Sequence, residues 1–539
     1  MDFLQSHLLT LVIFAPILGA VIIAFLPRDE GGQHKGVALL ASLLTFALSV
    51  PLAAGFRPAA RGFSFEQRTD WAPNLGFSYH VGLDGVALLL VLLTTFLGPI
   101  VVLSSWKYIQ DRVKFYCISL LVLETAMVGT LAALDLVLFY VFWEAMLIPM
   151  YLLIGMWGSE RRIYAAVKFF LFTFVGSVLM LLAIFYLWSH SAPPGQLRTF
   201  DYVALQAQMP SLAAGTQKWL FLAFALAFAI KVPVWPLHTW LPDAHTEAPA
   251  AGSIVLAGVM LKMGTFGFVR YAMPLFPAAA LQYAPAIAAL GVVGIVYGSL
   301  MCMAQQDLKR LIAYSSVAHL GFVMLGLSAL TPEAVNGAVL QMVNHGVSTG
   351  ALFLIVGYFY ERTHTRDLSQ YGGVARVAPA LSAVFLVVVL SSIGLPGTNG
   401  FIGEFLILIG TFTSTTPLGN WGSLPRGQVL SVLAATGVIL GAVYMLWMVQ
   451  RVIFGPKRRA AEHGMTDLTL REWLTVVPLL AAILLIGVYP QPFLSATRVP
   501  AEELIQRVAR PRAARPQGAG LQRPPDPDLP GAARAEGER

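Results

Sequence analysis

The sequence is dominated by apolar runs that are each long enough to cross a lipid bilayer. A helix needs about 20 apolar residues to span the hydrocarbon core, and such runs recur along the whole 539-residue chain. They start near Leu4, Val37, Leu83, Phe115, Leu134, Ile163, Trp219, Gly252, Leu281, Leu311, Ala334, Ala378, Val429 and Trp473. Because lipid cannot satisfy backbone groups, a spanning run must be helical or part of a closed barrel, and runs of this length favour helices. The sequence therefore predicts an all-α polytopic membrane protein with about fourteen transmembrane helices.

The composition supports this fold class. Charged residues make up 12% of the chain, whereas soluble domains carry about 25%. The run Leu8–Leu26 is long enough to span and has no basic segment before it, so it predicts a retained helix rather than a cleaved signal peptide. Cys117 and Cys302 lie far apart in apolar runs, which favours packing roles over a disulfide framework. The net charge of +7 comes largely from loops and the tail and does not indicate nucleic-acid binding.

One apolar run is interrupted beside a charge. The stretch Phe228–Pro249 reads FAIKVPVWPLHTWLPDAHTEAP, so Lys231 is followed closely by Pro233 and Pro236. A lysine inside a membrane costs about 2.5–3.5 kcal/mol on insertion scales. Proline breaks or kinks a helix, and the freed backbone groups are tolerated only where protein or water satisfies them. Both costs at one place indicate a route for ions or protons.

A second run is interrupted in the other half of the chain. The run that starts near Ala378 contains the segment Gly394–Gly400, GLPGTNG, and resumes as Phe401–Phe412. Glycine and proline at this density do not continue a helix. A broken span in each half is typical of inverted-repeat transporters, whose functional site lies at the breaks.

Four further charged residues lie inside apolar runs. Glu144 lies near the middle of its run and must be paired or protonated there, with Lys231 as its natural partner. Lys262 has apolar neighbours on both sides, and buried lysine can hold and release a proton, although snorkelling to the interface remains the alternative. Glu404 follows the second break directly. Glu124 is a further candidate, as a carboxylate on an access path or as one half of a structural pair.

Histidines connect these charges in chain order. His319 and His345 lie on neighbouring helices between Lys262 and Glu404, and imidazole can accept a proton at one nitrogen and donate one from the other. A hydrogen-bonded core histidine is the alternative for each. His238, in the first interrupted segment, is a further candidate for the relay. The spacing of the histidines does not match a metal site, and no motif for a nucleotide, flavin or iron–sulfur cluster is found, so we expect no cofactor in this chain.

The loops and the tail add three expectations. The long loop Phe56–His80 alternates aromatic and polar residues, which predicts a small hairpin. Residues Pro500–Arg507 predict a short interfacial helix, and 509–539, rich in Pro and Arg, predict a disordered tail. Alternate loops on one side carry most of the lysines and arginines, so that side is predicted to be cytoplasmic. With an even helix count, both termini then lie on the non-cytoplasmic side.

Four motifs resemble a known family. They are YHVGLDGVALLLVLL, FWEAMLIPMYLLIG, FAIKVPVWPLHTWLPDAHTEAP and QQDLKRLIAYSSVAHLGFV, and they resemble the antiporter-like membrane subunits of respiratory complex I. The resemblance covers most of the chain, from Leu4 to Pro490. In PGTNGFIGEFLIL, one branch of the family has glutamate, here Glu404, where its siblings tend to have lysine.

The resemblance implies a division of the chain and a role for each charge. It implies three N-terminal helices (1–114), two inverted five-helix repeats (115–272 and 281–454), a last helix with a short amphipathic segment (455–508) and the tail (509–539). It implies Glu144 and Lys231 as the input pair, Lys262 as the central site, His319 and His345 as the connection, and Glu404 as the exit toward the positive side.

The resemblance also implies partners and a cellular location. Such subunits carry no redox centre; electron transfer from NADH to quinone, through flavin mononucleotide and iron–sulfur clusters in other subunits, drives the proton pumping. The antiporter-like subunits L and N and the lipid bilayer of a bacterial cytoplasmic (inner) membrane are the expected surroundings. A subunit of a multisubunit Na⁺/H⁺ antiporter, or of a membrane-bound energy-converting hydrogenase, remains the alternative.

Overall fold

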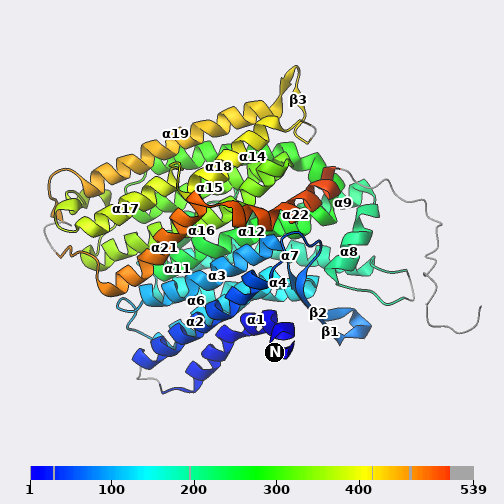
Figure 1. Cartoon of the computed structure of the whole chain (residues 1–539), viewed down its shortest axis with the longest axis horizontal. Helices are drawn as coiled ribbons and strands as arrows, with labels where there is room; N and C mark the ends of the chain where they lie inside the picture. The colour runs from blue at the N-terminus through cyan, green and yellow to red at the C-terminus, as the bar shows by residue number, and fades with distance from the viewer. Residues whose placement is uncertain (1, 28–30, 194–195, 416, 460–463, 510–539) are drawn as a thin grey trace, which may run out of the picture.

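The structure, a computed structural model, is a bundle of long helices with two small β-hairpins (Figure 1). It describes residues 2–27, 31–193, 196–415, 417–459 and 464–509, with side chains from His7 onward. Residues 510–539, which were predicted as a disordered tail, lie outside the described residues.

The helices follow one another along the chain with short connections. The first half contains α1 (Asp2–Phe25), α2 (Gly31–Gly55), α3 (Gly85–Ser104), α4 (Val113–Ala132), α5 (Leu136–Ala145), α6 (Leu147–Trp157), α7 (Arg162–Ser189), α8 (Tyr202–Gln208), α9 (Ala214–Lys231), α10 (Trp240–Glu247), α11 (Ala250–Val255), η3 (Leu256–Met260), α12 (Leu261–Gly267), η4 (Phe268–Ala272) and α13 (Met273–Leu275). The second half contains α14 (Pro277–Met303), α15 (Leu308–Ala329), α16 (Pro332–Thr363), α17 (Pro379–Ser392), α18 (Asn399–Thr413), α19 (Arg426–Ile453), α21 (Leu470–Val488) and α22 (Gln491–Ala509).

Twelve helical segments in the described part are long and apolar enough to cross a membrane. Two of these segments join several labelled elements, namely Leu136–Trp157 (α5 and α6) and Ala250–Leu275 (α11 to α13). The pairs α9–α10 and α17–α18 cover the two remaining runs that the sequence predicts as crossings, and each pair is interrupted. These crossings together agree with the fourteen that the apolar runs predict.

The first interruption lies where the prolines predict it. Helix α9 ends at Lys231, and the next helix, α10, begins only at Trp240. Pro233 and Pro236 lie between them and provide no N–H groups for helical hydrogen bonds. The indole of Trp240 donates to the carbonyl oxygen of Ile230 at 2.9 Å, which ties the two helices across the gap.

The second interruption separates α17 from α18. Gly394 and Gly397 have φ values of +77° and +89°, in the left-handed region where glycine is favoured. Asn399 starts α18 and binds α16 through its backbone and its side chain: its backbone carbonyl oxygen accepts from Asn344 Nδ2 at 2.7 Å, and its side-chain Oδ1 accepts from Ser348 Oγ at 3.1 Å. The break is therefore held against α16 by polar contacts.

The span Ala250–Leu275 contains two π-helical turns that the sequence did not predict. They are η3 and η4, and the regular turns of α12 lie between them. A π-helical turn widens the helix locally and changes which face its side chains present. Lys262, the second residue of α12, follows directly after the first of these turns.

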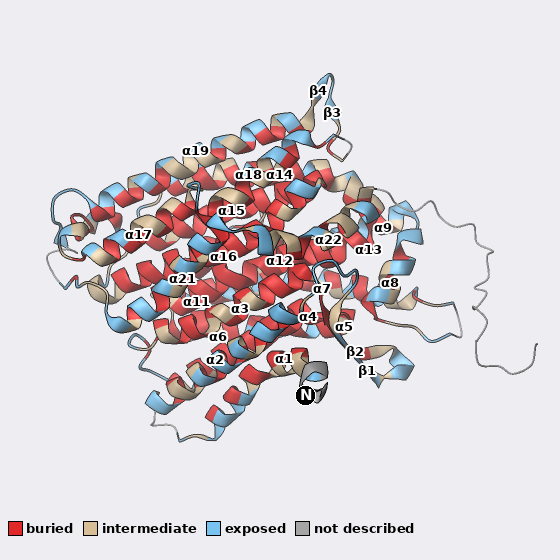
Figure 2. Ribbon diagram, in the orientation of Figure 1, coloured by how far each residue is buried: buried red, intermediate tan, exposed pale blue. Residues whose placement is uncertain are grey.

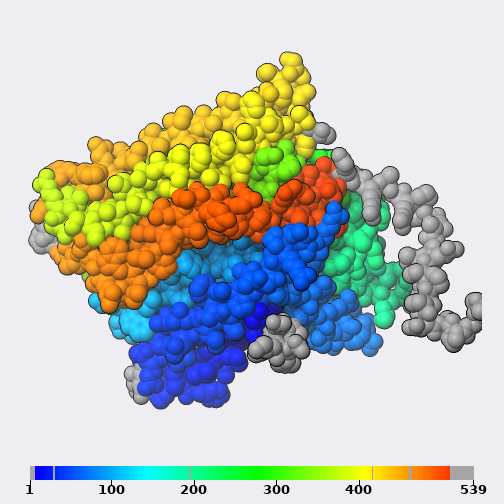
Figure 3. Space-filling model, viewed as in Figure 1, coloured from blue at the N-terminus to red at the C-terminus, as the bar shows by residue number. Residues whose placement is uncertain are grey.

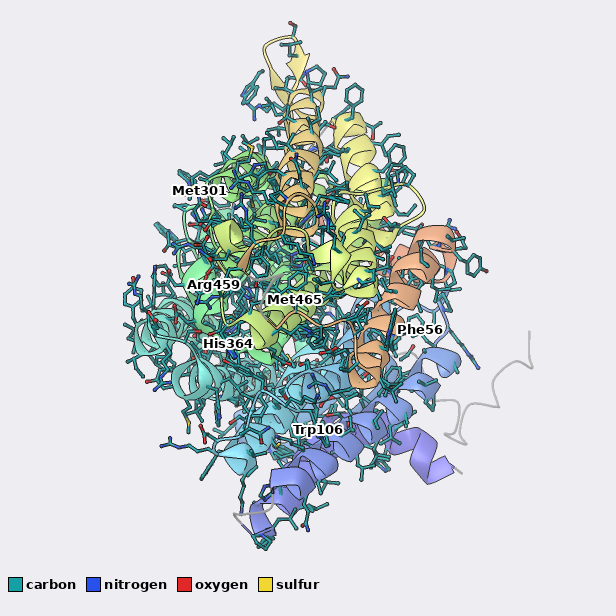
Figure 4. All side chains as sticks on the ribbon, turned by 90° about the vertical axis from the view of Figure 1, so that its left-hand side faces the viewer. Phe56, Trp106, Met301, His364, Arg459 and Met465 are labelled. Carbon is teal, nitrogen blue, oxygen red and sulfur yellow. The ribbon has the colours of Figure 1, made fainter. Side chains whose placement is uncertain are left out.

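Three spans form the centre of the bundle. The spans Ala250–Leu275, Leu308–Ala329 and Pro332–Thr363 are completely buried within the molecule over their most apolar stretches, while α2 and α19 are only one-third buried over theirs. Figure 2 shows the same gradient, with red helices in the middle and paler ones at the edges. In a view turned by 90°, side chains fill the space between the helices (Figure 4). The central spans carry Lys262, His319 and His345, so all three residues are buried in the molecule.

The predicted hairpin is confirmed. Strands β1 (Ser64–Ala72) and β2 (Phe77–Leu83) pair antiparallel, with Arg68 opposite His80. A second, smaller hairpin joins β3 (Asn420–Trp421) to β4 (Leu424–Pro425).

The predicted interfacial helix is longer than expected. Helix α22 begins at Gln491 rather than near Pro500 and continues to Ala509. A proline in the first turn, here Pro492, costs no helical hydrogen bond, and this allows the earlier start. The helix packs against α3, α13, α14 and α16. In the space-filling view, α21 and α22 form an orange-to-red band between the N-terminal helices and the second half of the chain (Figure 3).

Candidate functional site

Lys262 lies at the centre of the bundle and has a histidine as its polar partner. Its side chain is 0% exposed. Its Nζ lies 2.5 Å from Nδ1 of His345 and also donates to the carbonyl oxygen of Ala257, in the π-helical turn η3. The ammonium of Lys262 is therefore enclosed by protein and reaches other buried groups rather than the surface of the molecule.

The two central histidines face each other across α15 and α16. The rings of His319 and His345 have centroids 5.7 Å apart and an interplanar angle of 57°. Nε2 of His345 has no hydrogen-bond partner among the described residues. Since the rings are adjacent but not hydrogen-bonded to each other, a proton passing between them requires a ring rotation or a bridging water.

His319 in turn contacts the carboxyl group after the second break. Its Nδ1 lies 2.8 Å from Glu404 Oε1, and its Nε2 lies 3.3 Å from Ser392 Oγ at the end of α17. The side-chain amide of Gln341 donates to the same Glu404 oxygen at 3.0 Å. Both α17 and α18, on either side of the interruption, therefore provide groups that bind His319.

These contacts bring four of the predicted residues into one line. Lys262, His345, His319 and Glu404 succeed one another over three buried spans and the second broken helix. Each of them can gain or lose a proton, and imidazole can do both at once. The arrangement can therefore move a proton between Lys262 and Glu404 with small side-chain movements.

Glu144 and Lys231 are neighbours, but they do not form the direct ion pair that we expected. Among the described residues, no hydrogen bond is made by Lys231 Nζ or by Glu144 Oε1, although the two charges interact electrostatically. The Nζ atom lies 4.8 Å from the ring centre of Trp143 instead. Lysine over an aromatic face is stabilised by the ring quadrupole, and this contact takes the place of the carboxylate.

The histidines of the first interrupted segment are buried among aromatic rings. His238 is 3% exposed and packs edge-on against Tyr297, with ring centroids 5.1 Å apart. His245 stacks on Phe353 with ring centroids 4.5 Å apart. The structure gives no direct contact between either histidine and Lys231 or Lys262, so His238 is not part of the line described above.

Glu124 is buried at a different place, in the middle of α4. Its Oε2 accepts a hydrogen bond from Ser42 Oγ of α2 at 3.2 Å. This neutral contact replaces the charged structural pair that was one of its two expected roles.

Several polar residues around the line were missed in the sequence. Gln341 binds Glu404, and Asn344 and Ser348 bind the start of α18. Together with His345 they recur at positions that share one face of a helix. Polar residues at this helical spacing inside an apolar run indicate a polar face, so the sequence contained the information needed to predict them.

The described residues contain no group of three or more histidine, cysteine, aspartate or glutamate side chains arranged to hold a metal ion. Cys117 and Cys302 are both buried and unpaired, in agreement with their expected packing roles.

The fold and the buried residues together define a class of polytopic membrane protein, in which lysine, histidine and glutamate lie in line between interrupted helices. Residues 133–421 match the family described as "NADH:quinone oxidoreductase/Mrp antiporter, TM". The chain belongs to this family, as the resemblance in its motifs indicates.

Individual relatives are similar over nearly their whole length. NADH-quinone oxidoreductase subunit M from Rhodobacter capsulatus is 46% identical over 90% of this chain and 94% of its own. Among solved structures, a chain of respiratory complex I from Thermus thermophilus with bound NADH is 34% identical and has a TM-score of 0.80, covering 93% of this chain and 99% of that one. A chain of the Mrp complex from Dietzia sp. DQ12-45-1b is 22% identical over 91% of this chain and 52% of that one; with a TM-score of 0.77, it shares the fold.

Proposed function

We propose that this chain is the proton-translocating subunit of an NADH–quinone oxidoreductase that corresponds to subunit M. The observation that carries the proposal is the line of contacts from Lys262 through His345 and His319 to Glu404. The similarity to complex I subunits over nearly the full length supports the same assignment.

The family resemblance supports a role for each residue in this proposal. Glu144 and Lys231 receive the proton, Lys262 holds it at the centre, the two histidines pass it on, and Glu404 releases it toward the positive side. A change in the distance between Glu144 and Lys231 changes the field at both groups, since no ion pair locks them together. His238 adds a titratable group beside the first break.

Electron transfer takes place in other subunits in this proposal. The chain itself binds no cofactor, and flavin mononucleotide and iron–sulfur clusters belong to partner subunits. Its membrane neighbours include the antiporter-like subunits L and N. The assembly lies in a bacterial cytoplasmic membrane, with both termini of this chain on the non-cytoplasmic side and the two inverted repeats at 115–272 and 281–454.

A cation/proton antiporter subunit is the second candidate, because the Mrp chain has the same fold. An energy-converting hydrogenase subunit belongs to the same wider group. Glu404, in place of the lysine that sibling subunits tend to have, favours the oxidoreductase. Co-purification of the chain with flavin- and iron–sulfur-containing subunits distinguishes the candidates.

The proposal is tested by removing the central charge. In membrane vesicles that contain the assembled complex, Lys262→Met is expected to lower NADH-driven proton uptake by about tenfold or more, as is typical for the loss of a proton-transfer group. Lys107→Met changes an exposed lysine in a loop and serves as the matched control. Undiminished uptake by a fully assembled Lys262→Met complex would contradict the proposed function.

A further inference from the structure

The N-terminal helices hold a buried carboxyl group that lies outside the line from Lys262 to Glu404. Glu124 is 4% exposed, and its one hydrogen bond among the described residues comes from Ser42. Its other oxygen, Oε1, is buried and has no hydrogen-bond partner among the described residues. Since an ionised carboxylate without a counter-charge is costly to bury, the carboxyl group holds its proton in this arrangement.

Helix α3 leaves a space that this carboxyl group fills. A Cβ atom added at Gly98 would lie 2.7 Å from Glu124 Oε1 and 3.1 Å from its Cδ. Any larger residue at position 98 would therefore displace the carboxyl group. Gly98 of α3, Glu124 of α4 and Ser42 of α2 therefore pack closely together at one place.

The face of α2 that meets this site is polar, although α2 lies at the edge of the bundle. Ser42, Thr45 and Ser49 are buried, whereas Leu40 and Leu44 on the other face are 68% and 54% exposed. Residues three and four apart share one helix face, so the three hydroxyl groups form a stripe. A hydroxyl group can donate and accept at once, which suits it to passing a proton.

The stripe extends from the carboxyl group in both directions along α2. Ser49 Oγ lies 2.8 Å from Thr95 Oγ1 of α3. In the other direction Lys35 is buried at the same helix face, and its Nζ donates to the carbonyl oxygens of Trp106 and Ile109 at 2.9 and 2.6 Å. These carbonyls belong to the connection between α3 and α4. Ser42 is about 10 Å from Lys35 along the helix, at 1.5 Å per residue.

The titratable groups around Glu124 do not bind it. Between Leu8 and Phe25 α1 has none, and neither does α3. The elements packed against α4, and α4 itself, carry His34, Lys35, Tyr79, His80, Tyr140, Glu144, Tyr151, Lys262, Lys114, Tyr116 and Cys117. No hydrogen bond or ion pair joins any of them to Glu124 in the described structure, so its proton is held locally with Ser42.

We propose that Glu124 and Ser42 form a proton-binding site that is loaded and emptied along the hydroxyl face of α2, separately from the line that ends at Glu404. The inference rests on the proposed function. On release, Ser42 turns so that its oxygen accepts from the carboxylic acid. The O–H bond of Glu124 breaks, its electron pair stays on the carboxylate, and the proton binds the Ser42 oxygen while Ser42 gives its own proton to a water molecule on the hydroxyl face of α2. The ligand is a proton rather than a divalent cation, since such cations take about six or more oxygen ligands.

The test compares infrared difference spectra of the assembled complex before and after reduction with NADH. Glu124→Gln keeps an oxygen that accepts from Ser42, so a purely structural role survives, but the amide cannot carry the acidic proton. We expect this variant to lose a carboxylic-acid C=O band that the wild-type spectrum contains. Ser42→Ala is expected to shift the same band, because it removes the hydrogen bond to Oε2. Glu160→Gln, at an exposed loop position, leaves the band unchanged.

Two results would overturn the inference. One is a difference spectrum of Glu124→Gln that equals that of the wild type, and the other is a Glu124 band that does not respond to NADH. Either result leaves the proposed function intact as long as Lys262→Met lowers proton uptake. Normal uptake by Lys262→Met would count against the proposed function instead.

Discussion

Lys262 Nζ and His345 Nδ1 lie 2.5 Å apart between two completely buried spans. Both groups compete for one proton in this contact, because an ammonium can donate only to an imidazole nitrogen that carries no hydrogen. The hydrogen of neutral His345 then lies on Nε2, which has no partner of its own among the described residues. A proton that leaves Lys262 through this contact therefore has the ring of His319 as its nearest titratable acceptor on that side.

Replacement of His345 tests whether the imidazole passes the proton on. In His345→Gln, the side-chain oxygen can still accept from Lys262, but it cannot take up a proton and donate another. We expect NADH-driven proton uptake to fall by about 100-fold or more, the usual contribution of a proton-transfer group. Stopped-flow measurement with a pH dye in vesicles checks this. His190→Gln, at an exposed site, is the control, and equal rates in both variants would exclude His345 from the relay.

The carboxyl group of Glu404 and its neutral partner Gln341 are expected to differ in importance. Glu404→Gln removes the charge that faces His319, so proton uptake should fall by about tenfold or more. Gln341→Met removes a neutral hydrogen bond, worth about 0.5–1.5 kcal/mol, so its effect should stay within about tenfold. Initial rates of proton uptake in the two variants give the comparison. A larger effect for Gln341→Met would mean that orientation of the carboxyl group, rather than its charge, limits transfer.

The sequence predicts the crossings and both interruptions because these depend on local chemistry. The length of an apolar run determines whether it can span the membrane. Pro233 and Pro236, and the glycines near Gly394, interrupt a helix through their own backbone geometry. The contact of Lys231 with Trp143 could not be predicted in this way. It depends on how closely α5 and α9 approach, which is decided by packing over the whole bundle.

The π-helical turns beside Lys262 were missed for a related reason. Their residues, LAGVM and FVRYA, have no composition that separates them from an ordinary apolar helix. The charged residues and histidines of the site could be predicted, because they are unusual in apolar runs. Which residues they contact could not be predicted, because this depends on the three-dimensional packing of the helices.

The first interruption depends on close contact between α9 and α12. A Cβ atom at Gly264 would lie 2.6 Å from the Phe228 carbonyl oxygen and 2.9 Å from the Val232 amide nitrogen. Gly264→Ala should therefore destabilise the structure by about 1–3 kcal/mol, as overpacking typically does. Gly215→Ala, which has open space, is the control and should be neutral or slightly stabilising. The midpoints of thermal unfolding of the two variants in the purified complex are compared. Equal midpoints would show that α9 and α12 can accommodate the added methyl group without loss of stability.

Outside the membrane spans, a histidine joins the first hairpin to the segment before α8. His80 is 2% exposed; its Nδ1 lies 2.6 Å from Asp201 Oδ2 and its Nε2 lies 2.8 Å from Glu66 Oε1. Burial lowers the pKa of His80, but the hydrogen bonds with the two carboxylates outweigh this effect, so its pKa is raised above 6.5. Burial raises the pKa of Asp201, but the contacts with His80 and the Ala204 amide hold it below 3.8.

These shifts predict that the hairpin is held most firmly in mildly acidic solution. The raised pKa of His80 contributes stability that is complete below about pH 6.5 and is lost as the pH rises through the raised value. The lowered pKa of Asp201 contributes stability that is lost only as the pH falls below about 3.8. Hydrogen exchange in β1 and β2, corrected for intrinsic rates, should therefore become faster above neutral pH. His80→Gln should remove this pH dependence, and a dependence that persists in the variant would assign it to another group.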